Sequence, residues 1–196
     1  YYGAAVKIKN ILVSIVTSLG TVLLPRAAYY IEHQQMDEFK KLSRKALNFV
    51  FLVASPMMIY FMLFAKQGIY FLSGDAFGPA VVPMQLIMPT LLLIGITNIL
   101  GIQILVPLGY EKAVLVSEIV GAVIDLVVNA LLIPVYQSSG AAIGTLLAEF
   151  AVMVVQCIAL KNEIKTAFSD IKYLKIILAI ILASLASYWV TALNLH

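Results

Sequence analysis

The chain has 196 residues, of which 62% are apolar and only 12% carry a charge. A soluble domain has roughly a quarter charged residues, so this composition excludes an ordinary soluble fold. The formal net charge of +3 is small, and the basic residues lie beside apolar segments, which indicates membrane topology and argues against a nucleic-acid surface. The single cysteine, Cys157, rules out an intrachain disulfide and offers no metal cluster.

Uncharged apolar stretches of about 20 residues are long enough to cross a bilayer as helices. Isolated spans in lipid must satisfy their own backbone hydrogen bonds, and the alternation typical of a membrane barrel is absent. The sequence therefore predicts an all-α integral membrane protein with about six transmembrane helices. The spans are expected at 4–25, 45–66, 80–108, 113–133, 140–160 and 174–194.

The third expected span is unusual because helix-breaking residues lie in it and at its start. These residues are Pro79, Pro83, Pro89, Pro107, Gly95 and Gly101. Proline removes a backbone donor and clashes with the preceding turn of a helix. We therefore expect a kinked helix whose freed carbonyls need neighbouring helices or water. Kinks of this kind suit carriers that rock between two states.

Lysine and arginine are concentrated in alternate loops. The first, third and fifth loops hold Arg26, Lys40, Lys41, Arg44, Lys45, Lys112, Lys161, Lys165, Lys172 and Lys175, whereas the second and fourth hold only Lys66. Basic loops stay on the cytoplasmic side, so loops one, three and five are predicted to be cytoplasmic. The first loop, 31–46, also carries Met36, Phe39 and Leu42 at helical spacing, which fits either an amphipathic surface helix or a solvated linker.

The beginning of the chain also bears on its organisation. Tyr1-Tyr2-Gly3 contains no methionine, and no basic segment of a signal peptide follows it. An even number of spans would also place both ends outside, which is awkward for a complete bacterial carrier. We interpret the chain as a piece of a longer protein.

Ionisable side chains inside apolar spans are costly and are candidates for a polar pathway. On the fourth expected span Glu118, Asp125 and Asn129 are spaced so that they share one helical face. The opposite directions of this helix are covered by apolar residues. We expect Asp125, in the middle of the span, to face a water-filled cavity.

Polar residues of two other spans could line the same cavity. Asn98 lies in the middle of the kinked third span, and Thr145, Glu149 and Gln156 align on the fifth. Alternatively, the amide side chains hydrogen-bond neighbouring helices to one another, and the glutamates are solvated near the ends of their spans. Both interpretations remain open for these residues.

Catalytic patterns are absent from the sequence. It contains no glycine-rich phosphate loop with Lys-Ser/Thr, no GxSxG, no HExxH and only two histidines. We therefore expect neither an enzyme nor a cofactor.

Several blocks of the sequence resemble one family over nearly the whole chain. They are YYGAAVKIKNILVSIVTSLGTVLLPRAAYY, LGYEKA and VVNALLIPVYQSSGAAIGTLLAEF. In this order and at this distance, they resemble the oligosaccharide flippases, which are the polysaccharide transporter family of the multidrug, oligosaccharidyl-lipid and polysaccharide exporter superfamily. Lipid II flippases and multidrug extruders share the fold.

The resemblance implies a two-lobed transporter of about 12 to 14 spans that works by alternating access. Residues 1–134 would form helices of the second lobe, and 135–196 its last two helices. The implied activity is to flip an undecaprenyl-diphosphate-linked oligosaccharide across the bacterial plasma (inner) membrane for surface polysaccharide assembly. The implied partners are this lipid-linked substrate, the bilayer, and a coupling ion that no residue identifies.

The same resemblance bears on the substrate-binding residues, which we expect to be Lys7, Asn98, Asp125 and Asn129. Lys7 and Lys9 point about 200° apart on a helix and cannot do the same job. Lys7 shares its side with small polar residues, so we expect it to attract the diphosphate of the substrate. We expect Lys9, on an apolar side, to extend toward the outer headgroups. Alternatively, both lysines extend to the headgroups.

Other functions remain open at this point. A multidrug or lipid II exporter of the same superfamily is the first alternative. A non-transporting membrane assembly subunit is a second, although the polar face of Glu118, Asp125 and Asn129 argues against it. An intramembrane glycosyltransferase or ligase is disfavoured because the expected outer loops are short.

Overall fold

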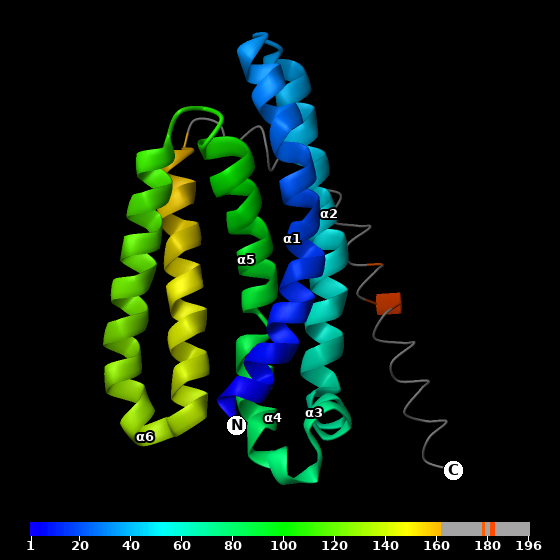
Figure 1. Ribbon diagram of the computed structural model, residues 1–196, viewed down its shortest axis with the longest axis vertical. Helices are drawn as coiled ribbons and strands as arrows, with labels where there is room; N and C mark the ends of the chain where they lie inside the picture. The colour runs from blue at the N-terminus through cyan, green and yellow to red at the C-terminus, as the bar shows by residue number, and fades with distance from the viewer. Residues whose placement is uncertain (162–177, 179–180, 183–196) are drawn as a thin grey trace.

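The computed structural model describes residues 1–161, 178 and 181–182, and these residues form an all-α bundle (Figure 1). The predicted fold class is therefore confirmed. The sixth expected span, 174–194, lies almost entirely outside the described residues.

The first two helices form a long antiparallel pair (Figure 1). Helix α1 runs over Tyr2–Glu32 and helix α2 over Met36–Leu63, and Gln34 turns between them with a φ of 57°. Phe39 and Leu42 are buried. The loop expected at 31–46 is therefore neither a separate surface helix nor a solvated linker, because both helices continue through the charged residues and bury their apolar face.

A broken helical segment follows. Its elements are α3 (Ala65–Ser73), the 3-10 helix η1 (Asp75–Ala80), α4 (Val81–Ile87), α5 (Thr90–Asn98) and the π-helix η2 (Ile99–Leu105). The stretches Asp75–Ile87 and Thr90–Leu105 are bent by 45° relative to each other, and Pro89 lies at the break. The kink predicted for the third span is present, since proline cannot donate the hydrogen bond that would continue the helix.

Helix α6 runs over Glu111–Ala159 and reverses at Gln137, where φ is 49° and ψ is −123°. The result is a pair of antiparallel arms (Figure 1). We call residues 111–136 the first arm and 138–159 the second arm. The spans expected at 113–133 and 140–160 correspond to these arms.

Among the described helices, α1, α2 and α6 are long and apolar enough to cross a membrane, α6 as its two antiparallel arms, and the bent pair is a further candidate if it forms one span. The interior between them is apolar, with Leu47, Met84, Leu91 and Leu100 fully buried. Large apolar side chains also cover the outside, and Leu126 on the first arm of α6 is 72% exposed. An apolar outer surface of this kind requires lipid around it.

The connections alternate between the two ends of the bundle. The turn between α1 and α2 and the loop before α6 lie at one end, whereas η1 and the reversal of α6 lie at the other (Figure 1). The first and third loops, which are rich in lysine and arginine, therefore share one end. Which side of the membrane this end faces stays a prediction from the charge bias.

Candidate functional site

The two arms of α6 carry polar side chains where they pack against each other. A Cβ atom on Gly144 would contact Asn129 Oδ1 and would lie 3.3 Å from Asp125 Oδ1, so both side chains point toward the second arm. These two oxygens are buried and have no hydrogen-bond partner among the described residues. Buried oxygens of this kind normally have a partner, so the pair has capacity to bind a donor or a cation.

An acidic group extends from this pair along α6. Glu149 on the second arm is half-buried and lies within Coulombic range of Glu118, Asp125 and Lys9. Glu149 therefore lies between two other carboxylates and one ammonium in its electrostatic surroundings. Lys9 was expected to extend toward the headgroups, but the structure places it half-buried near Glu149, because its side of α1 packs inward.

Lys7 lies apart from this acidic group. Its side chain is exposed, as are those of Asn10 and Ser14 on the same side of α1, whereas Leu12 and Val16 are buried. The polar stripe expected from the sequence is therefore on the outside of the described bundle. Its role as a binding surface stays a prediction.

Asn98 belongs to a cavity of about 240 Å³ between the bent segment and α6. Its lining residues are Ile94, Thr97, Asn98, Gly101, Ile102, Val114, Glu118, Glu149 and Gln156. The structure thus brings Asn98 together with two of the predicted acidic residues. Asp125 and Asn129 do not line this cavity, although Asp125 interacts electrostatically with Glu149.

Buried amides surround the π-helix η2 beside the cavity. A Cβ atom on Gly20 would contact Asn98 Oδ1 and would lie 3.0 Å from Gln103 Nε2, so α1 approaches the bent segment closely here. Gln156 Nε2 donates a hydrogen bond to Ser117 Oγ at 3.2 Å. Gln156 therefore joins the arms of α6 through its amide nitrogen, while its Oε1 atom has no partner among the described residues.

Two polar residues of this region, Tyr2 and Gln103, were not found from the sequence. Tyr2 and Thr145 hydroxyls are 2.8 Å apart and join the start of α1 to the second arm of α6. Gln103 is 1% exposed and has no side-chain hydrogen bond within the described part. The only signal for Gln103 was a lone glutamine in an apolar run, two residues after Gly101. Tyr2 and Thr145 are so far apart in the chain that no local pattern could indicate their contact.

This arrangement offers carboxylate and amide oxygens between apolar helices. In the part of the chain that the structure describes, no group of three or more His, Cys, Asp or Glu side chains could hold a metal ion. Apolar helices of this length around a polar cavity, with one helix broken beside it, define a multi-pass membrane transporter.

The family comparison is more specific. Residues 1–196 match the family described as lipid II flippase MurJ, and the chain belongs to this family. It is thus a multi-pass protein of the bacterial inner membrane, in a family of flippases rather than enzymes. No curated protein and no solved structure matched the chain.

The match supports part of the resemblance seen in the sequence. It supports the exporter superfamily and a lipid-linked precursor as cargo. Lipid II flippases were among the alternatives that the sequence left open. The match does not specify the oligosaccharide branch.

Proposed function

We propose that the protein moves an undecaprenyl-diphosphate-linked saccharide, with lipid II as the first candidate, from the inner to the outer leaflet by alternating access. The family match supports the cargo class. The position of the 240 Å³ cavity supports the mechanism, because Asn98 and Gly101 line it on the bent segment while Glu118 lines it on α6. A change in the 45° bend would therefore change the shape of the cavity.

We further propose how the predicted residues contribute. Asn98, Asp125 and Asn129 would line the polar path, because each has a buried oxygen without a partner among the described residues. Lys7 would attract the diphosphate from the exposed polar stripe of α1, where a second lobe of the transporter would face it. This last role depends on the two-lobed arrangement, which is itself part of the proposal.

Transport by the full-length protein in liposomes tests the proposal. Fluorescent lipid II, a lipid-linked surface polysaccharide unit and a hydrophobic drug would each be supplied in one leaflet, and their appearance in the other leaflet measured. We expect lipid II to be moved faster than in liposomes without protein. Movement of the polysaccharide unit alone would favour the oligosaccharide branch, which the GTVLLPR and LLIPVYQSSGAAIGTLLAE blocks resemble. The proposal would be contradicted if only the drug, or none of the three compounds, is moved.

A further inference from the structure

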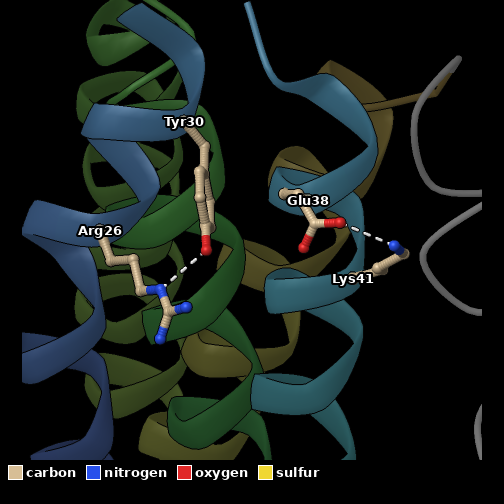
Figure 2. Close-up of polar contacts among 4 residues, drawn as sticks. All are labelled: Arg26, Tyr30, Glu38 and Lys41. Carbon is tan, nitrogen blue, oxygen red and sulfur yellow. Dashed lines mark hydrogen bonds and ion pairs between the residues drawn. The ribbon is translucent and has the colours of Figure 1, made fainter. Parts of the chain in front are cut away.

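A second cavity lies between α1 and α2 at the end of the bundle that carries their connecting turn. Its volume is about 380 Å³, and it is separate from the polar cavity beside α6. Charged residues of both helices line it together with leucine and phenylalanine side chains. Figure 2 shows three of the charged residues, Arg26 on α1 and Glu38 and Lys41 on α2. No role follows for it from the proposed function.

Arg26 is held in a defined position at this cavity. Its Nε atom donates a hydrogen bond to Tyr30 Oη at 2.8 Å, and its guanidinium carbon lies 5.5 Å from the centre of the Tyr30 ring (Figure 2). Only one of the five N–H donors of an arginine is used in this bond. The remaining donors can therefore bind a phosphate oxygen without reorganising the side chain.

The charges around the cavity leave a positive excess. Glu38 forms an ion pair of 2.7 Å with Lys41, and this hydrogen bond lowers the pKa of the Glu38 carboxyl, so the pair stays ionised and neutral as a whole. Arg26 and Lys45 also line the cavity and lie within Coulombic range of Glu38. Arg26 and Lys45 are thus two cations in the lining that the Glu38–Lys41 pair does not neutralise.

The inner part of the cavity is apolar. Leu19, Leu23 and Phe49 line it, and the apolar segment of α1 ends next to Arg26. The cavity therefore crosses the boundary between the hydrocarbon and the headgroup region of a bilayer, with its cations at the outer side. Basic pockets between membrane helices at this depth bind the headgroups of anionic lipids.

We propose that this cavity binds an anionic phospholipid, with its phosphate at Arg26 and Lys45 and the beginning of an acyl chain along Leu19, Leu23 and Phe49. The volume of about 380 Å³ fits a phosphate and the adjoining carbons. The saccharide of a transported precursor would have to extend outside the cavity. Charge and depth therefore favour a membrane phospholipid as the occupant.

Native mass spectrometry of the purified full-length protein tests this site. Phosphatidylglycerol and phosphatidylcholine would be titrated onto the parent protein, the double variant Arg26→Gln/Lys45→Gln and the control Lys112→Gln. Lys112 is exposed at the start of α6 and does not line the cavity. We expect the parent and the control to bind phosphatidylglycerol about tenfold more tightly than phosphatidylcholine, and the double variant to lose this preference.

Several outcomes would overturn the proposal. Equal binding of the two lipids by the parent, or an unchanged preference in the double variant, would do so. Displacement of phosphatidylglycerol by inorganic phosphate would indicate a site for a free anion instead. If the double variant also loses binding of lipid II, the cavity is a substrate site. If the double variant does not fold, Lys45→Gln alone, at an exposed side chain, carries the test with a smaller expected loss.

If the parent protein moves neither lipid-linked saccharide in liposomes but still prefers phosphatidylglycerol, the proposed function is contradicted and this site is not. The two proposals therefore fail separately.

Discussion

Asp125 is half-buried on the first arm of α6, and its Oδ1 atom has no hydrogen-bond partner among the described residues. A carboxylate at this depth is costly and is expected to serve transport. Asp125→Asn keeps the shape of the side chain and removes the charge. We expect it to lower transport of lipid II at least about tenfold, or ~1.4 kcal/mol, with a normal amount of protein in the membrane.

The liposome assay measures this effect. Asp75→Asn is the matched control, because Asp75 is exposed in η1 at one end of the bundle. Normal transport by Asp125→Asn would mean that the carboxylate is incidental.

The two lysines of α1 should respond differently to loss of charge. Lys7 is exposed, so Lys7→Gln should lower transport with little change in the melting temperature. Lys9 lies near Glu149 within an acidic group, so Lys9→Gln should lower the melting temperature by removing the only cation close to that group in the described part. Transport and thermal unfolding of both variants separate the roles. Equal, mild effects of the two substitutions on transport would mean that Lys7 does not bind substrate.

The sequence alone predicted the polar face on the first arm of α6, but not that Lys9 of α1 lies close to the acidic residues. Helical spacing is a local property, so Glu118, Asp125 and Asn129 could be placed on one face. The partner of Lys9 is Glu149, far along the chain, and only the packing of α1 against α6 brings them together. This is why Lys9 was expected at the headgroups.

At the scale of elements, the reversal of α6 depends on Gly140. A Cβ atom at this position would lie 2.5 Å from the backbone oxygen of Leu132, which cannot rotate away as a side chain can. We expect Gly140→Ala to lower the free energy of unfolding by about 1–3 kcal/mol, the usual cost of overpacking. Denaturation in a mild detergent measures it.

Gly3→Ala is the control for this substitution. Gly3 also lies in a helix, and a Cβ atom there would meet nothing within 4 Å. Equal stability of the two variants would show that the arms of α6 separate at little cost.

The bend of the third span could be predicted, but the ends of the helices could not. Proline acts on its own helix, so Pro89 in the sequence was enough to predict a kink. The expected spans ended where charges began, yet α1 continues to Glu32 and α2 begins at Met36. A transmembrane helix can continue beyond the surface of the membrane, as α1 and α2 do, whereas hydropathy marks only the part of the helix inside the lipid.

For the whole molecule, the topology is the first prediction to test. In a Cys157→Ala background, a cysteine at Lys41 should not react with an impermeant reagent added to intact cells, because the charge bias places that end of the bundle in the cytoplasm. A cysteine at Asp75, at the opposite end, should react and is the positive control. Labelling of Lys41→Cys from outside would reverse the orientation.

The class of protein could be predicted from composition, and its branch could not. A composition with 62% apolar residues and periodic charges in the loops leads directly to a membrane bundle. Because this pattern is common to flippases of both branches, short blocks such as GTVLLPR did not separate the lipid II flippases from the oligosaccharide branch.

Helix α6 also affects how the protein behaves once it leaves the membrane. Only 6% of an apolar 18-residue stretch of α6 is buried inside the described bundle, compared with 28% of such a stretch in α2. The described bundle therefore covers almost none of that stretch, which is left to contact acyl chains or the rest of the protein. A short-chain detergent covers such a surface poorly, so the arms of α6 should be the first part to loosen during extraction, and nanodiscs or long-chain detergents should preserve them. Hydrogen exchange in α6 would then report the quality of the solubilising medium before activity does.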